Sequence, residues 1–303
     1  MTQPKVIVIA GPTASGKSDM ATTVAKKYIA SGQKTIIINA DSQQVYKEIP
    51  ILSAHPTLQV QKDIPHALYG YLSAPTICNA GIWAQKAADT IKESWNKNII
   101  PILCGGTGFY IMALQNGLKA IPDIKHCYRE QAIERLEKIG IEKFYQECLT
   151  IDYEATIKIT PQDKHRLLRL WEVFHGTGKN TSWWHKNEKI TKFLPSAVWK
   201  PYLILPPRDK LYERINYRAE KILKNGAIEE VEKLLKTSIP SHHPVMKALG
   251  VQEITSFIKG EYTYEITLSK LQQYTRNFAK RQITWFKHQY KNAIHLRNNE
   301  EKL

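Results

Sequence analysis

The sequence predicts an α/β fold, with a parallel sheet flanked by helices, a helical insertion domain and a helical C-terminal region. Residues 6–10 form a short β-branched segment of the kind that is buried in a parallel sheet, and residues 18–29 have a helical pattern. Further short apolar strands are expected at residues 35–39, 99–104 and 202–205. Helical or mixed segments separate these strands, and such alternation indicates a parallel sheet covered on both faces.

The first strand and helix are joined by a phosphate-binding motif. Residues 11–18 read GPTASGKS and match the pattern G-x-x-x-x-G-K-[ST]. In such a P-loop, glycines let successive backbone N–H groups turn toward an anion, and the helix N-terminus adds partial positive charge. Lys17 supplies a full charge, and Ser18 is expected to hold Mg2+. The motif predicts a kinase-like P-loop core and a substrate that carries a pyrophosphate group. The loop residues expected to bind it are Gly11, Pro12, Thr13, Ala14, Ser15, Gly16, Lys17 and Ser18.

The order of the predicted strands and helices divides the chain into three parts. Residues 122–199 hold charged, helix-forming sequence and no buried strand, which predicts a helical insertion domain. Residues 1–121 are then the first part of the P-loop core, and residues 200–303 are its remainder with a basic helical C-terminal region. Within the last two parts we expect helices at residues 129–139, 163–174, 209–235 and 268–290.

The charge of the chain favours a polyanionic partner. Its 303 residues include 43 Lys and Arg against 28 Asp and Glu, a net charge of +15. Residues 266–299 contain no acidic residue. Their basic residues are Lys270, Arg276, Lys280, Arg281, Lys287, Lys291 and Arg297. This segment is expected to face a polyanion, although a merely solvated helix face is the simpler alternative.

Several classes of protein are disfavoured. No run of 18 apolar residues exists, and the phosphate loop lies too close to Met1 to leave room for a signal peptide, so we expect a cytoplasmic protein without a membrane span. The four cysteines are scattered without a C-x-x-C pair, which supports neither a zinc site nor a disulfide framework. We expect Cys78, Cys104, Cys127 and Cys148 to be ordinary buried thiols.

Polar residues follow two of the predicted strands. The second strand runs into Asp41, and the third runs into the glycine-rich segment 105–110. Since ligands of α/β proteins bind beyond the carboxyl ends of the strands, Asp41 is expected to face the phosphate loop and to act as a general base. A helix cap or an indirect contact with a magnesium ion remains an alternative role for Asp41.

Five motifs together resemble one family, the tRNA dimethylallyltransferases, also called tRNA isopentenyltransferases. The resemblance spans nearly the whole chain. The motifs are GPTASGKS at 11–18, DSQQVY at 41–46, PILCGGTGFY at 101–110, DKHRLLR at 163–169 and TRNFAKRQITWF at 275–286. The resemblance implies transfer of a dimethylallyl group from dimethylallyl diphosphate to the N6 amine of the adenosine immediately 3′ of the anticodon. The tRNAs concerned read codons that begin with U, and diphosphate is released.

The resemblance also implies roles for individual residues. Lys17 would neutralise the diphosphate, Asp41 would accept the amine proton, and Thr107 would contact the oxygen that bridges the prenyl and diphosphate groups. Arg218, or as second choice Arg214, would reach the diphosphate. The residues implied for tRNA are Asp41, Ser42, Gln43, Gln44, Thr107, Arg129, Gln162, Asp163, Lys164, His165, Arg166, Arg276, Lys280 and Arg281.

The expected partners are the tRNA anticodon stem-loop, dimethylallyl diphosphate and Mg2+, with no membrane, and the protein is expected to be a monomer. The resemblance implies that the loop binds the prenyl donor rather than ATP. ATP binding is suggested only by the general P-loop motif. In the last segment Arg276, Lys280 and Lys287 share one helical stripe. The second stripe, expected to pack in the core, holds Leu271, Tyr274, Phe278 and Trp285.

Two positions depart from the family pattern. A usual Thr-Ala-Lys-Pro run is replaced by Ser53-Ala54-His55-Pro56, and a usual His-His pair reads His66-Ala67. A phosphate contact by His55 would weaken above the usual histidine pKa of about 6.5.

Three other functions compete with the one that this resemblance implies. A phosphate-loop kinase of a small metabolite would share the loop and the aspartate but has no need of the basic C-terminal region. An enzyme that prenylates free adenine nucleotide would lack the insertion. A non-catalytic RNA-binding protein would not need Lys17, Asp41 and Thr107 together.

Overall fold

The computed structural model describes residues 4–241 and 243–296. The chain forms two compact units, each of which is described by itself. The larger unit contains Met1–Gln115 and Phe193–Leu303, and the smaller contains Asn116–Lys192. The structure thus separates the units at residues 116 and 192, whereas the sequence pattern predicts limits at 122 and 199.

The larger unit is built on a six-stranded sheet in the order β3-β2-β4-β1-β7-β8, and every pair of neighbours is parallel. Each of the four predicted strands is present, and β3 and β8 are additions that are too short to show a pattern. The strands are β1 (Lys5–Ala10), β2 (Lys34–Asn39), β3 (His66–Ala67), β4 (Ile99–Gly105), β7 (Val198–Ile204) and β8 (Ile294–Leu296). The predicted parallel sheet flanked by helices is confirmed.

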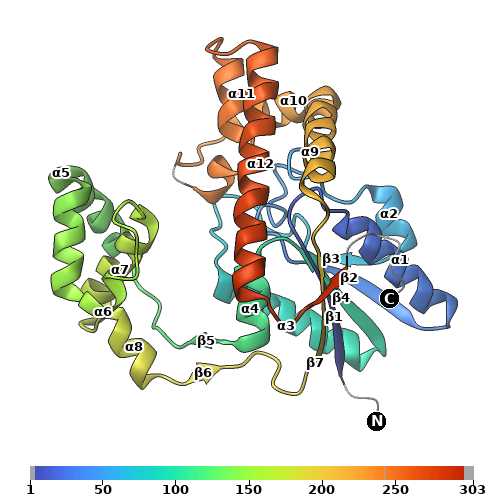
Figure 1. Ribbon diagram of the computed structural model, residues 1–303, viewed down its shortest axis with the longest axis horizontal. Helices are drawn as coiled ribbons and strands as arrows, with labels where there is room; N and C mark the ends of the chain where they lie inside the picture. Colours follow the sequence, from blue (N-terminus) through green and yellow to red (C-terminus); the bar gives the residue numbers. More distant parts are fainter. Residues whose placement is uncertain (1–3, 242, 297–303) are drawn as a thin grey trace. The chain divides into compact units, whose positions relative to one another are not determined.

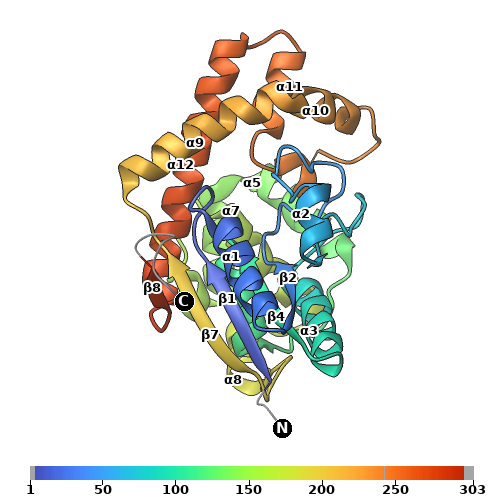
Figure 2. The same cartoon turned by 90° about the vertical axis from the view of Figure 1, so that its right-hand side faces the viewer.

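Helices cover both faces of this sheet because the central strands are apolar on both sides. On one face, α1 (Lys17–Ala30) lies over the strands (Figure 2) and buries Met20, Ala21 and Val24 against them. In α3 (Ala80–Asn96), the buried Trp83 donates its indole N–H to the carbonyl of Asn39 at the end of β2. The remaining helices of this half are α2 (Leu58–Asp63) and α4 (Gly108–Asn116).

Four helices gather beyond the carboxyl ends of the strands (Figures 1 and 2). They are α9 (Arg208–Ile222), α10 (Ile228–Leu235), α11 (Val251–Ile258) and α12 (Tyr264–Gln289), with a 3₁₀ turn at Pro244–Lys247. The predicted single helix at 209–235 is wrong: a π turn at Leu223–Ala227 interrupts it. Asn225 leaves helical geometry there, and Gly226 adopts φ 103°, which is easily reached only without a Cβ.

The smaller unit is helical, as predicted, and has its own core. It contains α5 (His126–Ile151), α6 (Tyr153–Thr156), α7 (Lys164–Thr177) and α8 (Thr181–Asn187), with a short antiparallel pair formed by β5 (Leu118–Lys119) and β6 (Ile190–Thr191). Gly140, at φ 77°, kinks α5. Phe144 and Trp171 pack in the core between α5 and α7.

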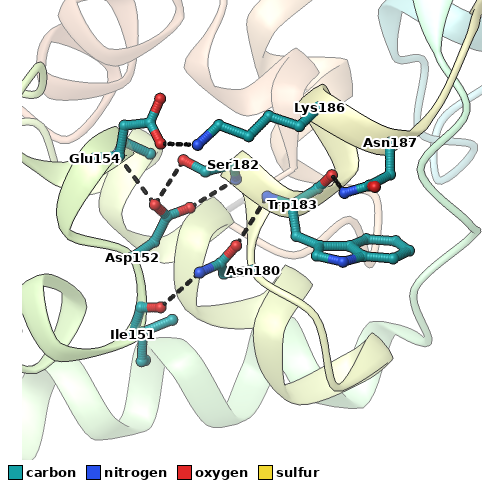
Figure 3. A network of polar contacts seen from close by, with 9 residues as sticks. Ile151, Asp152, Glu154, Asn180, Ser182, Trp183, Lys186 and Asn187 are labelled. Carbon is teal, nitrogen blue, oxygen red and sulfur yellow. Dashed lines mark hydrogen bonds and ion pairs between the residues drawn. The ribbon is translucent and has the colours of Figure 1, made fainter.

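A buried carboxylate holds the short helices of the smaller unit together (Figure 3). Asp152 begins α6 by accepting the N–H of Ala155, and it also accepts the N–H and the hydroxyl of Ser182 on α8, at 2.8 and 2.7 Å. Asn180 caps α8 and donates to the carbonyl of Ile151. Although Asp152 is only 2% exposed, its two oxygens accept hydrogen bonds from three donors, as a buried polar group requires.

The cysteines are free in the described part of the chain. Cys104 and Cys148 are buried as expected, whereas Cys78 is half-buried and Cys127 is exposed on the first turn of α5. For Cys127 the expectation was wrong, because it lies on the solvent-facing side of that helix.

Candidate active site

The phosphate loop is a tight turn between β1 and α1. Gly11 is required because a Cβ there would lie 2.6 Å from the carbonyl oxygen of Ile204 on β7. Ala14 and Gly16 both have positive φ, at 59° and 91°, so the peptide groups turn sharply before the helix begins. Ser15 is completely buried, and its hydroxyl has no partner among the described residues. The loop therefore has the shape and spare polar groups of an anion cradle.

Lys17 is folded back over this loop. Its ammonium group donates to the carbonyl of Pro12 at 2.7 Å. Burial lowers the pKa of Lys17, and the nearby Arg218 lowers it as well, whereas Cys104 and Asp41 raise it. Two partly desolvated cations close to each other favour an anionic ligand between them.

The loop after β2, which carries Asp41, and the loop after β4, which carries Thr107, are bonded to each other. Asn39 accepts the N–H of Asp41, and Asp41 Oδ1 accepts the N–H of Gln43 at 3.0 Å. Thr107 Oγ1 accepts the N–H of Ser42 at 2.9 Å and donates to the Ser42 hydroxyl at 3.2 Å. Of the roles considered for Asp41, a helix cap is ruled out, because its carboxylate closes a turn in which no helix begins.

One cavity in the larger unit is lined by several of these residues, although Ser42 and Thr107 are not part of its lining. Thr13, Lys17 and Ser18 of the phosphate loop, Asp41, Gln43 and Gln44 of the β2 loop, and Arg218 of α9 line it. Cys104 and Gly105 form part of the wall at the end of β4. Apolar side chains complete the lining: Leu52, Ile215, Ala219, Ile222, Leu249, Leu271 and Phe278. The cavity thus offers cations and a carboxylate beside an apolar wall.

Both predicted arginines reach the site from α9, one turn apart. Arg218 donates to the carbonyl of Ser53 at 3.4 Å, and burial lowers its pKa, whereas Asp41 raises it. Arg214 donates to the carbonyl of Ser15 at 3.3 Å, within the phosphate loop itself. Arg218 lines the cavity, whereas Arg214 contacts the backbone of the phosphate loop, and the contact of either arginine with the diphosphate stays a prediction.

Glu230 is a supporting residue that sequence reasoning missed. Its carboxylate, on α10, accepts the N–H groups of Ile51 and Leu52, both at 2.8 Å. These bonds hold the segment whose Ser53 carbonyl meets Arg218. Burial raises the pKa of Glu230, and the two backbone donors lower it. No local pattern identifies this residue, because the break after α9 is what brings it to the loop.

Gln282 is a second residue that was missed, although it lies within the R-Q-x-T-W-F motif. Its side chain is 7% exposed and touches both glycine-rich loops. The N–H of Thr13 donates to Gln282 Oε1 at 2.8 Å, and Gln282 Nε2 donates to the carbonyl of Gly106 at 2.9 Å. Its position on the buried face of α12 was the available signal.

His55 does not take the place of a cation. Burial lowers the pKa of His55, with Asp41 acting in the opposite direction, so the ring is neutral at pH 7. The ring lies edge-on to Tyr69 at 6.0 Å and is not part of the cavity lining. A phosphate contact by His55 stays a prediction, and burial moves the loss of the charge on its ring to a pH below 6.5. His66 Nδ1 lies 2.7 Å from the carbonyl oxygen of Ile64, and burial lowers its pKa too.

The residues predicted for tRNA in the smaller unit differ in their availability. Arg129 is not free: it forms an ion pair at 3.2 Å with the buried carboxylate of Glu172, which also pairs with Arg169. Asp163 caps α7 through the N–H of Arg166 and pairs with its guanidinium at 3.4 Å. Gln162, Lys164 and His165 are exposed.

On α12 the predicted basic stripe is only partly correct. Arg276 donates to Asn216 Oδ1 at 2.7 Å and lies over the ring of Tyr212, so it joins α12 to α9 and does not share the exposed stripe. Lys280, Arg281 and Lys287 are exposed, and Arg297 lies outside the described residues. A shallow groove on this face is lined by Asn277, Lys280, Arg281, Thr284, Trp285, His288 and Gln289.

The second predicted stripe of α12 is mixed. Leu271 is buried, and Phe278 and Trp285 are partly buried. Tyr274 is 46% exposed, so its expected place in the core is wrong. Gln282 and Phe286 occupy the buried face instead, because the helix turns its inner side toward the phosphate loop and β4.

Two further features concern metals and membranes. Residues 4–241 and 243–296 contain no group of three or more His, Cys, Asp or Glu side chains that could hold a metal ion. Within the same ranges, none of the helices is long and apolar enough to cross a membrane.

A parallel α/β sheet with a phosphate loop, a strand-end carboxylate and Arg218 around one cavity defines a P-loop enzyme of the kind that acts on phosphorylated substrates. The particular family follows from comparison with known proteins. The model of the family described as "IPP transferase" matches residues 44–289, and the chain belongs to this family.

Relatives that match over nearly their whole length are named as tRNA dimethylallyltransferases. The chain is 39% identical over 288 residues to a tRNA dimethylallyltransferase of Wolbachia sp. subsp. Drosophila simulans (strain wRi), covering 95% of both chains. It is 39% identical over 290 residues to that of Bartonella quintana (strain Toulouse), covering 96% of both.

Solved structures show the same fold. The full-length tRNA isopentenylpyrophosphate transferase from Bacillus halodurans has a TM-score of 0.67 at 26% identity, covering 97% of this chain and 90% of that one. A eukaryotic dimethylallyltransferase acting on tRNA has a TM-score of 0.76 at 26% identity, covering 97% of this chain and 73% of that one.

Proposed function

We propose that the chain transfers a dimethylallyl group from dimethylallyl diphosphate to the N6 amine of the adenosine immediately 3′ of the anticodon. Its substrates are then tRNAs that read codons beginning with U. The observation that carries this proposal is the cavity in which the phosphate loop, Asp41 and an apolar wall meet. A diphosphate fits the cationic side and a five-carbon prenyl group fits the apolar side. The names of the relatives support the same reaction.

The roles of the residues follow from this arrangement. The N6 nitrogen forms a bond to the prenyl carbon, the bond from that carbon to the bridging oxygen breaks, and the amine proton passes to Asp41. Lys17 and Arg218 neutralise the departing diphosphate, and Arg214 steadies the loop through Ser15. Thr107 donates to the bridging oxygen once its hydroxyl turns away from Ser42. Asp41 is a base by position, since it is the carboxylate that lines the cavity.

Magnesium fits the site through Ser18 and the substrate. The Ser18 hydroxyl lies at the first turn of α1 and lines the cavity beside Lys17. Mg2+ usually takes one or two protein oxygens together with substrate phosphates and water, so no cage of carboxylates is needed. When bound, the ion neutralises charge that develops on the diphosphate.

The anticodon stem-loop is proposed to contact three groups of residues. Asp41, Gln43 and Gln44 line the cavity, with Ser42 and Thr107 bonded to each other beside them, and these five residues are proposed to contact the adenosine. In the smaller unit, Gln162, Lys164, His165 and Arg166 are exposed, with Asp163 capping their helix. On α12, Lys280 and Arg281 line the exposed groove. Arg129 of the smaller unit is paired with Glu172, and Arg276 of α12 is bonded to Asn216, so an effect of either on tRNA binding passes through these protein groups. A cytoplasmic monomer is part of this proposal.

The deciding experiment incubates the purified protein with unmodified tRNA, Mg2+ and dimethylallyl diphosphate, followed by mass analysis of the nucleosides. We expect the mass of one dimethylallyl group on a single adenosine beside the anticodon. A parallel reaction contains ATP in place of the prenyl donor. Consumption of ATP without prenyl transfer would instead indicate a kinase.

A further inference from the structure

The contacts of Gln282 join the two loops that frame the candidate active site. Its amide lies between the phosphate loop, which follows β1, and the turn at residues 105–107, which follows β4. The orientation of the amide is fixed by its partners, because the N–H of Thr13 can only donate and the carbonyl of Gly106 can only accept. The amide oxygen of Gln282 therefore holds the phosphate loop, and its amide nitrogen holds the turn at residues 105–107.

The turn at residues 105–107 leaves room for this amide because residue 106 is a glycine. A Cβ on Gly106 would lie 2.5 Å from Gln282 Nε2 and 3.1 Å from the carbonyl oxygen of Gly11. Glycine at 106 therefore allows the amide and the phosphate loop to approach together. Gly106 is followed by Thr107, whose hydroxyl meets Ser42 in the Asp41 loop. A shift of the turn would move Thr107 relative to the phosphate loop.

Helix α12 does not depend on these two hydrogen bonds for its place. Leu271 and Phe286 are buried, at 3% and 0% exposure, and Arg276 is bonded to Asn216 of α9. The amide is thus attached to an independently anchored helix and can act as a fixed reference for the two loops.

We propose that Gln282 is a positioning residue that sets the separation between the phosphate loop and the turn at residues 105–107, and thereby places the phosphate loop and Thr107 for the diphosphate. This inference rests on the proposed function, since the diphosphate must occupy the phosphate loop. Gln282 does not touch the reacting atoms; it acts through Thr13 and Gly106.

The first test replaces Gln282 with Met, which has nearly the same length but does not donate a hydrogen bond. In the full-length protein, loss of both bonds should raise the Kd of inorganic pyrophosphate and the KM of dimethylallyl diphosphate about tenfold. The KM of tRNA should stay within about twofold, because the exposed groove of α12 is unchanged. Thermal unfolding monitors whether the variant remains folded.

The second test uses Q282E, which keeps the shape of the side chain. An ionised Glu accepts from Thr13 but does not donate to Gly106, and its charge repels the diphosphate. A protonated Glu restores both bonds. Relative to the parent at each pH, the pyrophosphate affinity of Q282E should therefore recover as the pH falls through the pKa of the new carboxyl group.

The matched control is Q272E, on the same helix. Gln272 donates to the carbonyl of Asn216 at 3.4 Å and does not line the cavity, so its replacement should leave pyrophosphate binding unchanged. The inference is overturned if the parent binds pyrophosphate and folded Q282M binds it equally well, or if Q282E shows no recovery at acidic pH. If the parent binds no pyrophosphate, the proposed diphosphate site itself is wrong.

Discussion

At the scale of single residues, the site combines one carboxylate with several cations in a partly enclosed cavity. Burial lowers the pKa values of both Lys17 and Arg218, and the nearby Asp41 acts in the opposite direction on each. The consequence is a cavity in which an anion is favoured and a proton acceptor stands nearby. Two predictions belong to this scale.

Replacing Asp41 with Asn should remove the proton acceptor while keeping the oxygen that accepts the N–H of Gln43. Turnover should fall by roughly two to four orders of magnitude, the usual range for loss of a general base, with tRNA binding nearly unchanged. Single-turnover prenyl transfer and a tRNA binding assay measure the two effects. Unchanged turnover would remove Asp41 from the mechanism.

Histidines that are partly withdrawn from water should lower the free energy of unfolding at mildly acidic pH. Burial lowers the pKa of His55 in the folded protein, so below the unfolded value of 6.5 the unfolded chain binds the extra proton first. The free energy of unfolding is therefore fully maintained above pH 6.5 and decreases as the pH falls through the window below it.

Urea unfolding at several pH values tests this prediction, with His55→Gln as the variant. Its stability should fall less steeply between neutral and acidic pH than that of the parent. Some slope should persist, because burial lowers the pKa of His66 and His175 in the same direction. Identical slopes for parent and variant would show that His55 titrates alike in both states.

At the scale of elements, breaks and caps decide where the functional groups lie. The π turn after α9 brings Glu230 to the backbone of Ile51 and Leu52. In the smaller unit, Asp152 performs a comparable task for α6 and α8 (Figure 3).

Replacing Asp152 with Ala should leave the N–H groups of Ala155 and Ser182 without their acceptor. A loss of about 1–3 kcal/mol in the stability of this unit is expected from such unsatisfied donors. Hydrogen exchange of the α6 and α8 amides in the full-length protein is the measurement. Glu154→Ala, which breaks only the exposed ion pair to Lys186, is the control and should leave that exchange nearly unchanged. Equal protection in both variants would contradict the anchoring role of Asp152.

At the scale of the whole molecule, the net charge of +15 favours a nucleic acid as partner. Not all of the basic side chains can bind a nucleic acid, because Arg129 and Arg276 are already bonded to groups of the protein. Lys280 and Arg281 line the exposed groove of α12 and remain the better candidates for binding phosphates.

Replacing Lys280 and Arg281 together by Ala should therefore flatten the dependence of log affinity for tRNA on log salt. The slope should change by about 0.7 to 0.9 for each tRNA phosphate that the variant no longer neutralises, while kcat at saturating tRNA stays nearly the same. Arg276→Ala is the control: it should lower stability by weakening the packing of α9 on α12 and leave the salt slope unaltered. A slope that is unchanged in the double variant would show that these side chains face solvent only.

The fold, the phosphate loop and the place of Asp41 were predictable from local sequence, whereas Thr107, Arg214 and Arg218 were named only through the family resemblance. A run such as residues 6–10 is apolar on both faces and must be buried, and the glycines of residues 11–18 permit backbone angles that other residues adopt at a cost. Strand ends in a parallel sheet meet at one edge, which is why Asp41 could be expected near the phosphate loop. Whether Asp41, Thr107 and the arginines have their proposed roles stays a prediction.

What only the tertiary structure decided is which polar side chains are already used by the protein itself. Arg276 and Lys280 look equivalent in sequence, yet Asn216 and Tyr212 engage the first, whereas the second is exposed. Gln282 and Glu230 bond to loops that are far away in the chain, such as those of Thr13 and Ile51. Periodicity predicts only on average which face of an element is buried, because it sums over apolar residues, and Tyr274 of α12 is an exception. The partner of one buried hydrogen bond depends on the meeting of distant segments, which happens only once the chain is folded.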